Sequence, residues 1–156
     1  MKKNPMKFIV LAVVLGLVSP HSMSSGHPDW MNRAYEVENP ESFAYYVAVG
    51  SACPVVENEI RYLAETIIVR SRLSPVSEWS DSDRLYLSIE VSCIDRDLLP
   101  PIFMSNIHFQ IDHHVPIQFR RNYGQFGTGD NASVNDSIRD SVERAVTDFI
   151  RVNFDL

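Results

Sequence analysis

The feature that most constrains this chain is the alternation of side chains between residues 84 and 95. Every second residue is apolar, and the residues between are mostly polar. The apolar positions are Leu85, Leu87, Ile89, Val91 and Cys93. This pattern is typical of a β-strand with one face on a core and the other face in polar surroundings. The chain therefore has to cover one face of a sheet.

Two segments with helical spacing can supply that cover. From Pro54 to about residue 72, apolar residues recur three or four positions apart, and proline suits a first helical turn. The second segment, about residues 133–153, has the strongest helical pattern in the chain. Its apolar positions are Val134, Ile138, Val142, Ala145, Val146, Phe149 and Ile150.

Two further segments predict strands in the first half of the chain. Residues 43–52 are apolar or aromatic at both odd and even positions, which favours a central strand covered on both sides. Residues 73–80 predict a weaker strand, which Pro75 directs to an edge of the sheet.

The second half of the chain leaves one choice open. Residues 96–104 include Pro100-Pro101 and predict a loop. Most odd-numbered residues from Ile107 to Phe119 are apolar. Either one long strand spans residues 105–121, or a hairpin turns at residues 112–114, and both arrangements preserve the faces.

The predicted order of elements is β-α-β-β-β-α. We expect an α+β, two-layer sandwich with a mostly antiparallel sheet of three to five strands and both helices on one face. Residues 26–42 predict an irregular lead-in, and residues 43–156 are long enough for a single domain with one core.

Residues 1–25 match a cleaved secretion signal. Three lysines and an apolar run from Phe8 to Val18 precede small polar residues. The run is shorter than the roughly 20 residues of a membrane-spanning helix. No cysteine follows it that could carry a lipid anchor. We therefore expect a soluble, periplasmic protein without a transmembrane segment in the mature chain.

All three lysines of the chain lie in this leader. Their removal changes the formal net charge from −6 to −9. Nucleic acids and anionic lipids bind clustered positive charge, so such an acidic chain disfavours both as main partners.

Cys53 and Cys93 are the only cysteines. An even number of cysteines in an exported protein predicts a disulfide. Cys93 lies on the apolar face of its strand, and Cys53 lies at the start of a helix expected on that side. Two buried thiols or a metal site are the alternatives, but the chain has no CxxC pair of the kind found in zinc sites.

Candidate metal ligands gather at His108, Asp112, His113 and His114. On one strand, His108, Asp112 and His114 would share a face. Residues four positions apart lie about 13 Å apart at about 3.3 Å per residue, too far for one ion unless the chain folds back. We expect no metal or other cofactor.

Patterns for covalent chemistry are weak. Ser51 follows Gly50 but lacks the second glycine of a hydrolase elbow. Cys53 could act as a nucleophile only if it were unpaired. We expect no enzymatic activity.

The element Pro28-Asp29-Trp30-Met31, followed by a Val49-Gly50-Ser51-Ala52 turn and a helix, resembles the LPP-twenty-type lipoprotein family. The resemblance covers about residues 28–68. Members of the FlgP kind are accessory proteins of flagella and the outer membrane, so the resemblance implies a non-catalytic envelope protein. The lipid-anchor cysteine of the family is absent here.

These observations favour an exported accessory protein that assembles with itself or with an envelope complex, and the resemblance implies flagellar or outer-membrane machinery. Trp30, Tyr45 and Tyr46 are candidate contact residues, since aromatic side chains dominate interface energetics. For the two tyrosines, the alternative that we favour is that they fill the core. The alternative is a small periplasmic protein that binds a ligand or metal through residues 108–114.

Overall fold

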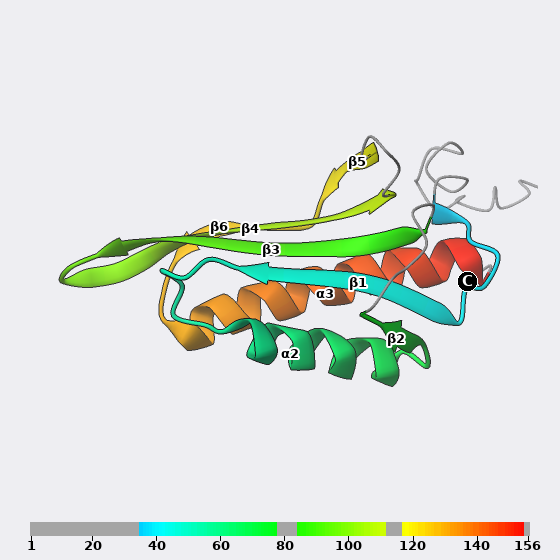
Figure 1. The fold of residues 1–156 in the computed structure, drawn as a ribbon, viewed down its shortest axis with the longest axis horizontal. Coiled ribbons are helices and arrows are strands. Elements are labelled where there is room, and N and C mark those ends of the chain that lie inside the picture. Colours follow the sequence, from blue (N-terminus) through cyan, green and yellow to red (C-terminus); the bar gives the residue numbers. More distant parts are fainter. Residues whose placement is uncertain (1–34, 78–83, 112–116, 155–156) are drawn as a thin grey trace, which may run out of the picture.

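The computed structural model describes residues 35–77, 84–111 and 117–154 (Figure 1). The predicted leader, Trp30 and the three residues Asp112 to His114 lie outside the described residues. The elements, in chain order, are β1 (Ser42–Val49), α2 (Glu57–Arg70), β2 (Ser74–Val76), β3 (Leu85–Arg96), β4 (Leu99–Ile111), β5 (Ile117–Asn122), β6 (Phe126–Thr128) and α3 (Asn131–Asn153).

The strands form one sheet in the order β2-β1-β3-β4-β5, and the short β6 also pairs with β4. β1 runs parallel to β2 and β3, whereas β4 pairs antiparallel with β3, β5 and β6. Both helices cover the same face of the sheet (Figure 1). The predicted α+β class is confirmed. The sheet is mixed because α2 carries the chain back to the starting end of β1, where β2 begins in the same direction.

The core lies between the sheet and the two helices. Odd-numbered residues of β3, such as Leu87 and Ile89, are fully buried there. Phe109 of β4 packs at ring-centroid distances of 4.7 Å from Tyr35 and 6.1 Å from Phe149 of α3. Tyr35 belongs to the predicted lead-in, so the described part of that segment contributes to the core although it is largely irregular.

The segment predicted as a loop at residues 96–104 is instead the end of a β3–β4 hairpin that turns at Asp97-Leu98. The ladder is irregular where Ile94 and Arg96 meet β4, and the two prolines lie opposite that irregularity. Since a ladder that is already interrupted needs fewer N–H donors, proline is tolerated there.

Two other expectations are resolved by the sheet. β4 and β5 pair antiparallel, with Gln110 opposite Gln118, so residues 105–121 form a hairpin and not one strand. β2 lies at the edge of the sheet, as Pro75 predicts. β1 is an inner strand, but its Tyr46 is 43% exposed, so at that position the strand is not covered on both faces.

A candidate interaction surface at the β3–β4 hairpin

The β3–β4 hairpin extends past the ends of both helices (Figure 1). Its base is fixed by a disulfide between Cys53, in the loop before α2, and Cys93 of β3, whose Cα atoms lie 4.9 Å apart. The Gly50 amide also donates a 2.8 Å hydrogen bond to the Val91 carbonyl. The disulfide joins the two cysteines that the sequence pairs, and it is typical of an oxidising, extracytoplasmic compartment.

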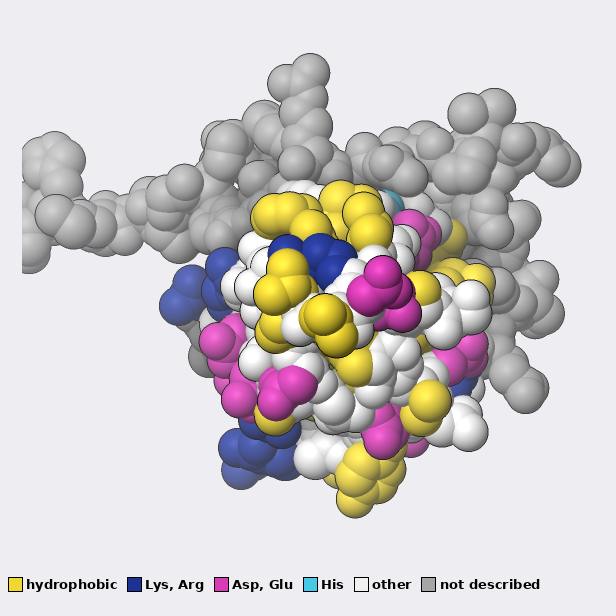
Figure 2. Space-filling view, turned by 90° about the vertical axis from the view of Figure 1, so that its left-hand side faces the viewer, with side chains coloured by type: hydrophobic (Ala, Val, Ile, Leu, Met, Phe, Trp, Pro, Cys, Tyr) yellow, Lys and Arg dark blue, Asp and Glu magenta, His cyan; other side chains and the backbone are white. Residues whose placement is uncertain are grey.

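Large apolar side chains are exposed at this end of the molecule. Leu98 in the hairpin turn is 96% exposed, and Phe126 of β6 is 73% exposed. We call the hairpin patch the set Ile94, Leu98, Leu99, Met104 and Phe126. Figure 2 looks onto this end and shows hydrophobic side chains gathered around basic and acidic ones.

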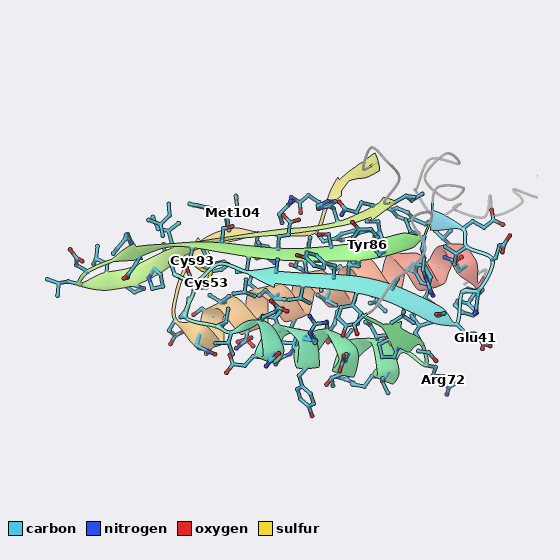
Figure 3. All side chains as sticks on the ribbon, viewed as in Figure 1. Glu41, Cys53, Arg72, Tyr86, Cys93 and Met104 are labelled. Atoms are coloured by element: carbon cyan, nitrogen blue, oxygen red, sulfur yellow. A yellow bond between two sulfur atoms is a disulfide. The ribbon has the colours of Figure 1, made fainter. Side chains whose placement is uncertain are left out.

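The register of the strands makes part of this patch continuous. Met104 lies opposite Phe126 on one side and Ser92 on the other. One step nearer the turn, Ile102 lies opposite Ile94. Met104 points away from the helices, while Cys93 and Cys53 lie on the helix side (Figure 3). The patch therefore occupies the helix-free face of the sheet and wraps around the hairpin turn.

Leaving these side chains in water has an energetic consequence. Full burial of a Leu, Ile, Met or Phe side chain contributes roughly 1.5–3 kcal/mol, so each exposed member forgoes much of that. Exposed apolar residues elsewhere, such as Tyr62 and Val69 of α2, need no such explanation because single ones are common on surfaces. A contiguous apolar patch with polar surroundings is typical of an interaction site.

The other end of the same face is polar and buried. Tyr86, Ser88, His108 and Gln110 are all less than a tenth exposed. His108 Nε2 lies 3.0 Å from Gln110 Oε1, and the Gln110 amide donates to the Tyr86 hydroxyl. Ser88 Oγ donates to Glu90 Oε1 at 3.2 Å. This network fixes side chains whose burial would be costly without partners.

Of the predicted metal ligands, the structure describes only His108. His108 is in the polar network, and its Nδ1 has no hydrogen-bond partner among the described residues. Asp112 and His114 lie outside those residues. Within the described ranges, no three His, Cys, Asp or Glu side chains are grouped closely enough to hold a metal ion.

The predicted aromatic contact residues separate into different environments. Tyr45 is fully buried under α2, where its hydroxyl donates to Glu65 and the Arg61 guanidinium lies 5.9 Å from the ring centre. Burial and the Glu65 carboxylate raise the pKa of Tyr45. Tyr45 therefore fills the core, which is the alternative that the sequence favours for it, because the parity of β1 turns its side chain toward α2. Tyr46 lies on the helix-free face and is partly exposed.

A second buried hydrogen bond joins α3 to the loop between β5 and β6. The Tyr123 hydroxyl donates to Asp148 Oδ2 at 2.9 Å, and Arg151 Nη1 lies 3.9 Å from the other oxygen. Burial, together with Tyr35 and Asp148, raises the pKa of Tyr123 far above its usual value. The phenol therefore stays protonated and acts as a hydrogen-bond donor, which suits a structural role.

The sequence contained the signal for the hairpin patch, but the loop prediction concealed it. Leu98 and Leu99 follow Asp97 directly and precede the two prolines, so the pattern predicts a turn there. The unbroken apolar run from Leu98 to Met104 is unusual for a loop and is the signal that could have identified the patch.

Comparisons with known proteins give little further information. No protein-family model and no curated protein matches the sequence. Among solved structures, a minor lipoprotein from Acinetobacter baumannii is similar over 67% of this chain and 89% of that chain, at 10% sequence identity and a TM-score of 0.33. Neither described helix has the length and hydropathy needed to cross a membrane.

Proposed function

We propose that this chain is a periplasmic, non-catalytic accessory protein that assembles through the hairpin patch, either with an envelope complex or with a second copy of itself. The observation that supports this most is the group of exposed apolar side chains on a hairpin whose base is held by a disulfide. A fixed base keeps the patch in one geometry, which lowers the entropy lost when a partner binds.

The polar groups are consistent with a structural role. His108, Gln110 and Tyr86 bind one another, and Tyr123 binds Asp148. Tyr123 is buried and its pKa is raised far above its usual value, so its hydroxyl serves as a donor to Asp148 and is a poor nucleophile. The resemblance of residues 28–68 to the LPP-twenty-type family points in the same direction and extends the proposal to flagellar or outer-membrane machinery.

Site-specific photocrosslinking in the exporting cell tests this function. A photoreactive residue is placed at Leu98 or Phe126 in the hairpin patch, and at Tyr62 of α2 as a control that is as exposed as Phe126. We expect protein adducts from both patch positions and none from Tyr62. Exported, folded protein that gives no adduct from either patch position would contradict the proposed function.

A further inference from the structure

We infer that the hairpin patch binds a protein segment that is apolar at its centre and carries Lys or Arg at its margins, in preference to a second copy of this chain or a membrane. This inference rests on the proposed function, because it specifies the partner of the same surface.

The centre of the patch on the sheet face carries no charge. One cross-strand row consists of Ser92, Met104 and Phe126, and the next consists of Ile94, Ile102 and Thr128. Interfaces between proteins have such a centre, depleted of charged residues and enriched in Met and aromatic side chains, with polar residues around it. A segment that covers these two rows has to present apolar side chains.

The margin of the patch is acidic. Glu90 precedes Ser92 on the same face of β3, and Asp97 is exposed in the hairpin turn beside Leu98, whereas the exposed Asp95 alternates to the face of Cys93 (Figure 3). Arg96 is the one basic residue between them, and its guanidinium donates to the Pro100 carbonyl, with Nε at 2.9 Å from that oxygen. Glu90 and Asp97 thus adjoin the apolar centre, beside one arginine that is already engaged. Basic side chains on a partner would be attracted by this arrangement.

The same charges disfavour the two other occupants. Two copies joined patch to patch would bring both sets of carboxylates within about 10 Å, the screening length at 0.1 M salt, where like charges repel. The formal net charge of −6 adds to this repulsion. An anionic lipid leaflet would be repelled for the same reason, since it attracts basic and not acidic segments.

Strand addition at the edge of the hairpin is a weaker mode of binding than docking on its side chains. β1 pairs with β3 only as far as Val91, and no described strand pairs with that edge of β3 between Ser92 and Arg96. The open edge is short and carries Asp95, and edge strands with charged side chains resist pairing. The apolar face is therefore the surface that provides the affinity.

A pair of matched peptides tests the inference. One is a soluble, fluorescent 12-residue peptide that alternates Leu or Val with Arg, and its twin has Glu in place of every Arg. We expect the Arg peptide to bind the mature, oxidised protein at least tenfold more tightly than its twin, by fluorescence anisotropy at 50 mM salt. The difference should shrink at 300 mM salt because screening weakens surface charge interactions.

Three variants assign the binding to the patch. Met104→Thr/Phe126→Thr should weaken the Arg peptide at least tenfold, while the control Tyr62→Gln leaves binding unchanged. Asp97→Asn should weaken the Arg peptide and reduce its salt dependence. Unchanged circular dichroism and Tm show that each variant is folded.

The outcomes that overturn the inference differ from those that overturn the proposed function. If both peptides bind alike and Met104→Thr/Phe126→Thr weakens both, the patch is an interface but its preference for basic segments is wrong. Failure of the Arg peptide to bind through the patch overturns the inference, whereas crosslinking at Leu98 decides the proposed function separately. Patch-dependent dimers in sedimentation, or binding to vesicles of phosphatidylglycerol, also overturn it by identifying another occupant.

Discussion

On the helix-free face of the sheet, the polar end is buried and the apolar end is exposed, which is the reverse of the usual arrangement. At one end, Ser88 and His108 are buried, and at the other, Met104 and Phe126 lie in water. Ser88 and His108 are directly paired across β3 and β4, and Met104 lies only four residues before His108 on the same face of β4. A single strand therefore passes from a buried polar environment to an exposed apolar one within about two side-chain repeats.

This difference shows that the alternation of apolar and polar residues along a strand does not determine what covers each face of the strand. Alternation decides which side chains face the helices, and it places both His108 and Met104 on the opposite face. It does not decide what lies over that face. Buried polar side chains then require mutual hydrogen bonds, whereas exposed apolar side chains gain stability only when a partner covers them.

Removal of the disulfide should have the largest effect on this comparison, because it anchors the hairpin end only. Cys53→Ser/Cys93→Ser opens a link between residues 40 positions apart, and should lower the free energy of unfolding by about 4 kcal/mol. Urea unfolding measures the loss, and reduction of the wild-type protein should reproduce it.

Hydrogen exchange locates the effect of the same variant. Backbone amides of residues 92–99 should exchange in Cys53→Ser/Cys93→Ser through local openings that cost much less than global unfolding, while amides near His108 exchange only through global unfolding at its lowered free energy. Equal opening free energies at both ends would mean that the disulfide stabilises the whole domain and does not specifically anchor the hairpin.

Replacement of His108 tests the buried polar end. His108→Ala removes the group 3.0 Å from Gln110 Oε1 and leaves that oxygen buried without this partner, while the amide nitrogen keeps its hydrogen bond to Tyr86. The expected loss is about 2 kcal/mol, since an unsatisfied buried polar group costs roughly 1–3 kcal/mol. The midpoint of denaturant unfolding measures it at an unchanged m-value. A loss below about 0.5 kcal/mol would show that His108 behaves as a surface residue.

The sequence predicts the elements whose pattern is set by one face. The alternation at residues 84–95 predicts β3, and the periodicity from Val134 to Ile150 predicts α3. The pairing of Cys53 with Cys93 was also accessible, because strand parity and a nearby helix start place both on one side of the sheet. In each case a local pattern and the tertiary arrangement favour the same answer.

The candidate site could not be predicted in the same way. Pro100 and Pro101 are strong loop signals, but an irregular ladder accommodates them and lets β3 and β4 continue to the turn. Tyr45 and Tyr46 have the same side chain, and only the position of α2 decides that the first is buried. How far the hairpin extends past the helices depends on strand and helix lengths in three dimensions, which no local pattern contains.

The smallest effect on stability is expected at the exposed apolar end. Met104→Thr and Phe126→Thr retain residues with high strand propensity at positions that are already more than half exposed. Each should therefore change the free energy of unfolding by less than about 0.5 kcal/mol, as surface substitutions usually do. Denaturant unfolding beside His108→Ala gives a direct contrast on one strand face. A loss for Met104→Thr as large as that for His108→Ala would mean that Met104 is already covered within this chain, and the hairpin patch would then be part of the core and not a surface for a partner.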